Sequence, residues 1–284
     1  MPNITDPRLV TEINRCWDLY LRGLLRDLVS QLGMARRCFE FAREEMGPRS
    51  TANADIELRM VEVITQMVTA EGREDSIKAA DTLATEAADF RTPVETVCRV
   101  AAFAVGVHAA MRLTRLDLAE ERFRQALAMS QGLAAEGGED GVTMDDVSTL
   151  VGCAGLHLAI TAASAGDTNT ASALLDHSAK AAEAQGREHA YMGQYFGPQH
   201  VGAVGCIVLA TLGQHQACVD SARAVDLAAL YPLVRVNLLR AVADCHERIE
   251  QPAVAAALRA RADALAPPLR RQFGLDTEAP QSGG

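Results

Sequence analysis

The sequence predicts an all-α protein, built as a right-handed superhelical array of about six helical hairpins. Composition is the first indication: 49% of the 284 residues are hydrophobic but only 4% are aromatic, so Ala, Leu and Val dominate. Ala and Leu are strong helix formers. The second indication is a small-residue triplet, Ala-x3-[Phe/Leu/Ser/Ala]-x2-[Ala/Ser], that occurs six times. The third is that turn signals separate the triplets, whereas no convincing strand-period stretch is bounded by turn residues.

The triplets place small side chains on one helix face, where a neighbouring helix can approach closely. Each is preceded by another helical stretch and a turn, so each marks the second helix of a hairpin. They follow one another at intervals of 36 to 52 residues. The six are Ala35-Phe39-Ala42, Ala80-Ala84-Ala87, Ala119-Phe123-Ala126, Ala171-Leu175-Ser178, Ala217-Ser221-Ala224 and Ala253-Ala257-Ala260.

Helix boundaries along the chain support this division. Asp6-Pro7 begins the first helix, and Gly47-Pro48 ends the first hairpin. Thr92-Pro93-Val94-Glu95 predicts a helix start, with Thr as N-cap, Pro at the first position and Glu at the third. Thr143 predicts a similar start, because acidic residues follow it in the first turn. The turns inside hairpins are expected at Gly72, Gly166 and Gly213.

In the second half, proline marks the helix starts. Pro198 suits a first helical position because its missing N–H has no partner there, and Gly197 interrupts whatever precedes it. Pro232 and Pro252 are expected to open the two helices of the last hairpin. The Gly-rich acidic segment 132–143 is expected to be a solvated linker or, alternatively, a lid over a groove. The repeat domain is predicted to cover residues 1–268, and the tail, 269–284, to be disordered at its end.

Charge and apolar runs limit the possible classes of protein. The formal net charge of −10 disfavours direct nucleic-acid binding, because an acidic chain repels phosphate backbones. The N-terminus lacks the regions of a signal peptide, and the apolar runs, such as Val201–Leu212, look too short to span a bilayer. Seven scattered cysteines without a C-x2-C pair indicate reduced, buried thiols. We therefore expect a soluble, cytoplasmic protein without membrane contact.

The repeat pattern resembles that of tetratricopeptide repeats, whose period is about 34 residues and whose consensus contains Ala-x3-Phe. From about Tyr191 to Pro268 the chain is similar to the C-terminal tetratricopeptide domains of actinobacterial helix-turn-helix transcription regulators. The residues that carry this resemblance are Phe196-Gly197-Pro198-Gln199-His200-Val201, the Leu212-Gly213 turn and Val225-Asp226.

Two features depart from that group of regulators. His200 stands where the group often has Asn, and no DNA-binding module precedes residue 1. The chain is therefore expected to be a sensor domain cut from a regulator, or a free-standing relative. The resemblance implies ligand sensing and self-association. A homodimer through the terminal repeats is expected, because solenoid ends expose apolar faces and the last hairpin, Ala253–Leu265, carries Ala and Leu on much of its surface.

In a hairpin array, the first helix of each repeat lines a concave groove. A mainly apolar groove with a few polar groups suits a small molecule or a short peptide. His157 and His200 are candidate polar groups of this groove. Placing the triplets in tetratricopeptide register points further side chains into it: Trp17, Tyr20, His108, Arg112, Leu156, Ile160, Gln199, Cys206, Arg235 and His246.

The sequence predicts no catalytic, metal or cofactor site. It contains no P-loop, no G-x-S-x-G and no G-x-G-x-x-G. Cys153 and His157 share a helix face, but no third ligand completes a zinc set, so packing or a hydrogen bond is expected for His157. Cys245 and His246 diverge by about 100° on a helix, so His246 is expected to pair with Glu250 instead.

The aromatic residues allow two interpretations each. Tyr191, Tyr195 and Phe196 are expected to form a loop plug between repeats four and five, with a stacking platform as the alternative. Trp17 and Tyr20 can share one helix face. That face lies either at the mouth of the groove or in the core between the first two hairpins.

The leading functional interpretation is a ligand-sensing domain of a regulatory protein. A scaffold that docks a protein partner is one alternative. An enzyme of secondary metabolism, using His108, His157 or His200 as acid and base, is the other. The sequence does not identify the ligand.

Overall fold

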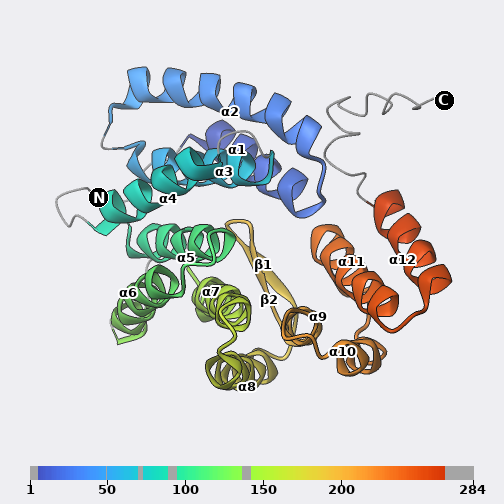
Figure 1. The fold of residues 1–284 in the computed structure, drawn as a ribbon. Helices are drawn as coiled ribbons and strands as arrows, with labels where there is room; N and C mark the ends of the chain where they lie inside the picture. Colours follow the sequence, from blue (N-terminus) through green and yellow to red (C-terminus); the bar gives the residue numbers. More distant parts are fainter. Residues whose placement is uncertain (1–5, 49, 70–72, 89–94, 136–141, 266–284) are drawn as a thin grey trace, which may run out of the picture.

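The computed structural model describes residues 6–48, 50–69, 73–88, 95–135 and 142–265. Over these ranges the chain forms twelve helices and one two-stranded antiparallel sheet, which confirms the all-α class (Figure 1). The helices are α1 (Pro7–Leu21), α2 (Leu25–Met46), α3 (Ala52–Thr69), α4 (Arg73–Ala88), α5 (Thr96–Arg112), α6 (Leu116–Ala135), α7 (Met144–Ser164), α8 (Thr168–Gln185), α9 (Pro198–Thr211), α10 (His215–Ala222), α11 (Pro232–Arg248) and α12 (Pro252–Leu265).

Some predicted features lie outside the described residues. They are the tail 269–284, the helix-start residues Thr92, Pro93 and Val94, the turn residue Gly72, and positions 136–141 of the Gly-rich segment. The predictions for these residues remain untested.

Each odd-numbered helix packs against the even-numbered helix that follows it. Contacts between α1 and α3, α3 and α5, α5 and α7, α7 and α9, and α9 and α11 link successive pairs. Helix α1 also contacts α11, so the odd-numbered helices form a closed series. The β-hairpin lies at the centre of this series, where it contacts α7 and α9 (Figure 1).

Several helix ends fall where the sequence predicts them. The Asp6 carboxylate caps α1 by accepting a hydrogen bond from the Arg8 backbone N–H at 2.8 Å. Thr143 and Asp146 form a reciprocal capping box at the start of α7. Gly47 caps α2, and the prolines that open α9, α11 and α12 are Pro198, Pro232 and Pro252.

The small-residue triplets are buried or half-buried in α2, α6 and α8, and so are the described members of the α4 triplet. In α10 and α12 the predicted triplet residues face solvent instead. The buried small residues there are Cys218, Ala255 and Ala262. The predicted register was therefore wrong by one residue in α10 and by two in α12. These helices carry small residues on several faces, so the pattern alone does not select the buried one.

A β-hairpin corrects the prediction that the chain contains no strands. Strand β1 (His189–Tyr191) pairs with β2 (Gln194–Phe196), so that His189 lies opposite Phe196. The turn is formed by Met192 and Gly193, both with positive φ, as a tight two-residue hairpin requires. Three residues per strand are too few for a period of two to be recognised in the sequence.

Helix α7 corrects the expectation that the apolar runs are too short for a membrane. By length and composition alone α7 could span one, but 67% of its apolar window is buried inside the protein. It contacts α5, α6, α8, α9 and both strands. Its apolar character is therefore that of a core helix, and it forms the wall against which the hairpin is placed.

Candidate functional site

Hydrogen bonds hold the hairpin between α7 on one side and the start of α9 on the other. His189 Nε2 lies 2.7 Å from Asp146 Oδ1, and Glu188 Oε1 accepts a hydrogen bond from the Gln199 backbone N–H at 2.5 Å. The Tyr195 hydroxyl donates to the Ala229 carbonyl oxygen at 2.7 Å. These anchors fix the position of both strands.

Phe196 packs so closely on α7 that only glycine fits beneath it. The ring is fully buried, and a Cβ added at Gly152 would lie 2.5 Å from it. Tyr195 is buried as well. Tyr195 and Phe196 are therefore buried as expected of the aromatic plug, in a hairpin rather than a loop, whereas Tyr191 is only half-buried.

The tip of the hairpin touches the only tryptophan. Gly193 has φ +70°, and a Cβ there would overlap the six-membered ring of Trp17. Trp17 also contacts Tyr20 edge to face, with ring centroids 6.4 Å apart. Leu21 and Gly193 line two neighbouring cavities, which we call the histidine cavity and the acidic cavity.

The histidine cavity has a volume of about 200 Å³ and lies where five odd-numbered helices meet the hairpin. Most of its wall is apolar, with polar side chains at intervals. The lining residues are Tyr20 and Leu21 from α1, His108, Met111 and Arg112 from α5, Cys153, Leu156, His157 and Ile160 from α7, Gly193, Gln194 and Tyr195 from the hairpin, His200, Val204 and Ile207 from α9, and Leu233, Val234 and Asn237 from α11.

Of the twelve side chains expected in the groove, five with polar groups meet in this cavity. They are Tyr20, His108, Arg112, His157 and His200, which come from four helices distant in the sequence. Leu156 and Ile160 line it too. Trp17 lines the neighbouring acidic cavity instead and is only 4% exposed, so it is at once a packed core residue and a cavity wall.

The remaining candidates lie elsewhere, where the assumed register pointed the wrong way. Gln199 Oε1 accepts a hydrogen bond from the Asp226 backbone N–H at 2.7 Å, which ties down the loop after α10. Arg235 donates to the Leu230 carbonyl oxygen at 2.9 Å, and Cys206 is buried in the core. His246 Nδ1 lies 2.8 Å from Gln251 Oε1, not against the predicted Glu250.

The three cavity histidines are held in their neutral form by burial. The rings of His108 and His157 stack with centroids 4.5 Å apart, and His200 lies 5.0 Å from the Tyr195 ring. Burial, with a smaller contribution from the Arg112 charge, lowers the pKa of His108 to about 4. Burial also lowers the pKa of His200 to about 4. The pKa of His157 lies well below its usual value, because of burial and then the neighbouring His108 and His200.

Two of these histidines carry a buried nitrogen without a partner. Nδ1 of His157 and Nδ1 of His200 make no hydrogen bond with any described residue. Leaving a buried donor or acceptor unsatisfied costs about 1–3 kcal/mol. Both rings line the cavity, and Nδ1 of each is a polar atom whose hydrogen-bonding capacity the described residues leave unused.

The cavity offers little for metal or nucleophilic chemistry. The described residues contain no group of three or more His, Cys, Asp or Glu side chains placed to hold a metal ion. Burial raises the pKa of the Cys153 thiol to about 12, so the thiolate that attacks or ligates is suppressed.

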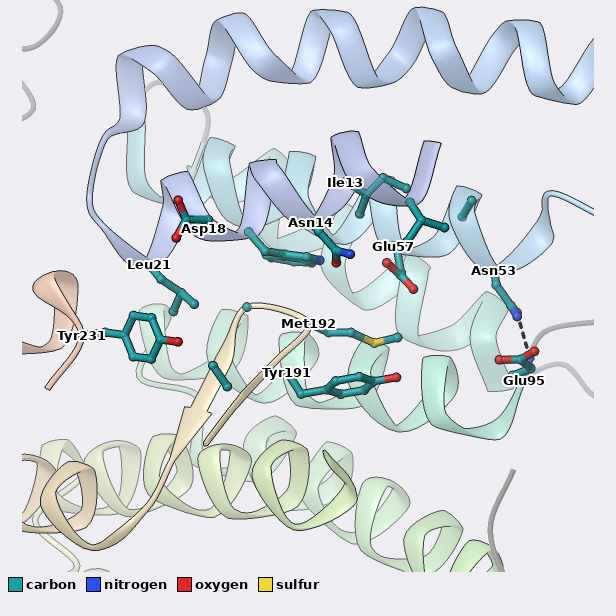
Figure 2. A pocket seen from close by; sticks show the side chains of 15 residues that line it. Ile13, Asn14, Asp18, Leu21, Asn53, Glu57, Glu95, Tyr191, Met192 and Tyr231 are labelled. Carbon is teal, nitrogen blue, oxygen red and sulfur yellow. Dashed lines mark hydrogen bonds between the residues drawn. The ribbon is translucent and has the colours of Figure 1, made fainter. Parts of the chain in front are cut away.

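The acidic cavity is larger, about 420 Å³, and lies between α1, α3 and the hairpin tip (Figure 2). Asp18, Leu21 and Tyr231 stand at one end, and Asn53 and Glu95 at the other. Asn53 Oδ1 accepts a hydrogen bond from the Glu95 backbone N–H at 2.9 Å. The remaining lining residues are Val10, Ile13, Asn14, Trp17, Ala54, Glu57, Ala190, Tyr191, Met192 and Gly193.

Sequence reasoning missed Glu57, the carboxylate in the middle of this cavity. Burial, and then the charge of Glu95, raise the pKa of Glu57 to about 7. Glu57 lies on α3 three residues after Ala54 and four before Val61, both of them buried. A charged residue at a position that the helical period assigns to the buried face was the signal that could have identified it.

Comparisons with protein-family models, with curated proteins and with solved structures find no match to this chain. The resemblance to tetratricopeptide sensor domains therefore rests on the sequence pattern alone. Function has to be argued from the two cavities.

Proposed function

We propose that this chain is the ligand-sensing domain of a regulatory protein and that it binds a small neutral organic molecule in the histidine cavity. The observation that carries the proposal is the pair of unpartnered Nδ1 atoms, of His157 and His200, on neutral rings that line a mainly apolar cavity. Buried polar groups without partners are rare in proteins, and binding sites are one place where they are retained. A ligand hydroxyl can serve either tautomer of a neutral imidazole, because it both donates and accepts.

We also propose that the helices form a tetratricopeptide-like right-handed array of six hairpins. The support is the pairing of each odd-numbered helix with the next even-numbered one. The odd-numbered helices supply the cavity wall, as the first helices of such repeats do. A ligand that touches five helices would favour one arrangement of the hairpins over others. Ligand binding would thereby change the populations of the protein's conformations.

The proposal includes a cytoplasmic homodimer that binds no nucleic acid itself. Helix α12 exposes Val254 and most of its alanines, which supports association through this end. The acidic net charge of −10 argues against contact with a phosphate backbone.

The alternatives find less support in the cavity. A volume of about 200 Å³ is below the usual range for drug-sized ligands, so a short peptide fits poorly. An acid–base enzyme needs a pKa near the working pH, whereas those of His108 and His200 are lowered to about 4. A small molecule with an apolar body and one polar group fits best.

Phenol and toluene provide a matched test, because they share size and shape and differ only in that phenol has a hydroxyl where toluene has a methyl group. A cavity of about 150 Å³ can bind benzene, so both probes are small enough for this one. We expect phenol to bind about 5- to 10-fold more tightly than toluene, because its hydroxyl reaches a free histidine nitrogen. Calorimetry and mass spectrometry of small molecules released from the purified protein would measure probe affinity and native occupancy.

A histidine variant shows where the probes bind. His200→Phe keeps a ring in place but removes the nitrogen, and should abolish the preference for phenol over toluene. His246→Phe, outside the cavity, should leave that preference intact. Equal affinity of the wild-type protein for the two probes, or no binding of either, would contradict the proposal.

A further inference from the structure

The acidic cavity is a second site with a different charge. Its volume of about 420 Å³ lies within the range of about 300–1,000 Å³ that ligand pockets have. Asp18, Glu57 and Glu95 line it, and no Lys, Arg or His is found among the described lining residues. A wall that carries one sign of charge favours a ligand of the opposite sign.

Glu57 is the carboxylate best placed to meet such a ligand. It reaches from α3 toward Tyr191 and Met192 of the hairpin (Figure 2). It makes no ion pair with any described residue, whereas Asp18 lies 3.4 Å from Arg22. Burial and the charge of Glu95 raise its pKa to about 7, so the ionised form is disfavoured in the empty cavity. A cation beside Glu57 would relieve that penalty.

Three aromatic rings share this cavity with the carboxylate. Trp17, Tyr191 and Tyr231 line the cavity together with the Met192 thioether. Aromatic faces attract organic ammonium groups, and rings arranged around a carboxylate are typical of sites that bind amines. A small metal ion, by contrast, needs several oxygen ligands around one point, and the described residues contain no group of three or more His, Cys, Asp or Glu side chains placed to hold one.

Trp17 adds a hydrogen-bond donor that has no acceptor. Its side chain is 4% exposed, and Nε1 has no partner among the described residues. The six-membered edge of the indole packs at Gly193, so the edge that carries Nε1 is turned away from the hairpin tip. A buried indole N–H usually finds an acceptor. A ligand oxygen would supply one here.

We propose that the acidic cavity binds an organic ammonium cation that also carries an oxygen acceptor. The ammonium group lies beside Glu57 among the aromatic rings, and the oxygen accepts a hydrogen bond from Trp17 Nε1. The site is separate from the histidine cavity, and it does not depend on the function proposed for that cavity.

Choline and 3,3-dimethylbutan-1-ol test this assignment, because they have the same shape and hydroxyl group but only choline is charged. Trp17 is the only tryptophan of the chain, so its fluorescence reports binding directly. We expect choline to bind about 10-fold more tightly than its neutral analogue. Calorimetry provides an independent measurement.

Two variants separate the roles of charge and donor. Glu57→Gln should reduce the affinity for choline to that for the neutral analogue and leave the affinity for the analogue unchanged. Glu45→Gln, on the exposed face of α2, is the control and should change neither affinity. Trp17→Phe keeps an aromatic ring but loses the N–H. By calorimetry, this variant should bind choline several-fold more weakly than the wild-type protein does. Its affinity for tetramethylammonium, which has no hydroxyl, should fall much less. Melting curves should show that both variants are folded.

Three results would overturn the proposal: no choline binding at millimolar concentration, equal binding of choline and its neutral analogue, or full choline affinity in Glu57→Gln. Binding of a lysine-containing peptide without binding of choline would also overturn it, because the surface would then dock a protein partner.

Discussion

The histidine cavity and the acidic cavity share Leu21 and Gly193, yet burial changes their titratable groups in opposite directions. In the histidine cavity it lowers the pKa of His108 and of His200 to about 4. In the acidic cavity it raises the pKa of Glu57 to about 7. Removal from water disfavours the charged form in each case.

The difference between the cavities lies in what charge remains at neutral pH. Imidazoles whose pKa is about 4 carry no charge, so the rings of the histidine cavity are neutral and Arg112 is the charged side chain among its described lining residues. Glu57, with a pKa of about 7, is partly ionised, and Glu95 stands at the same cavity. One hairpin tip thus separates the proposed site for a neutral ligand from the proposed site for a cation.

Substitution at the shared tip should damage both cavities and have the largest effect. Gly193→Ala forces an L-residue into a left-handed conformation, which costs about 1–2 kcal/mol. The added Cβ also overlaps Trp17, and overpacking costs about 1–3 kcal/mol. We expect a total loss of about 2–5 kcal/mol in the free energy of unfolding, measured by urea denaturation.

Gly213→Ala is the matched control for this loss. Gly213 has a similar φ of +74°, but a Cβ there meets nothing within 4 Å. Its substitution should cost only the backbone strain, about 1–2 kcal/mol. An equal loss in the free energy of unfolding for the two variants would mean that the hairpin tip does not pack tightly on Trp17.

Acid should destabilise the protein through the histidine cavity. The unfolded chain protonates histidine near pH 6.5, whereas His108 and His200 resist protonation in the folded protein until about pH 4. Their contribution to stability is therefore fully present above pH 6.5 and is lost as the pH falls toward 4. By pH 5 the loss should be about 2 kcal/mol per histidine. His200→Phe should make the acid limb of a stability–pH curve shallower, and an unchanged limb would contradict a buried His200.

The acidic cavity should have the opposite pH dependence. Glu57 has a raised pKa, so its protonated form favours folding below about pH 4.5, and this contribution is lost as the pH rises through about 7. Because Glu57 is only half-buried, solvent screening should limit the effect to about 1–2 kcal/mol. Glu57→Gln should remain more stable than the wild-type protein at pH 8, and the advantage should disappear at pH 4. Asp18, Glu95 and Tyr191 line the same cavity and are unchanged in this comparison.

The smallest effect is expected outside both cavities. His246 lies on α11 against Gln251. His246→Ala should change the free energy of unfolding by less than about 0.5 kcal/mol and leave probe binding unaltered. A larger loss, measured by the same urea titration, would show that the surface of α11 is coupled to the cavities.

The sequence predicts the helices well because caps, prolines and Ala-rich faces are local features. The tetratricopeptide register also places His108 and Arg112 in the groove, and both line the histidine cavity. Sequence reasoning fails in α10 and α12, where alanines occupy several faces and packing alone chooses the buried one. It misses the hairpin because three-residue strands leave no recognisable period. Glu57 was missed because its importance depends on α1 and the hairpin, which are distant in the sequence.

The central claim is that His108, His157 and His200 meet in one cavity and that burial keeps their rings uncharged. The most direct test is a pH titration of the histidine Cε1–H resonances by NMR, with a single Phe variant of each histidine to assign its signal. The account predicts that these three resonances stay unshifted from neutral pH down to about pH 5.5, because burial keeps the rings neutral. Resonances that titrate near pH 6.5 would show that the histidines are open to water and would contradict the cavity.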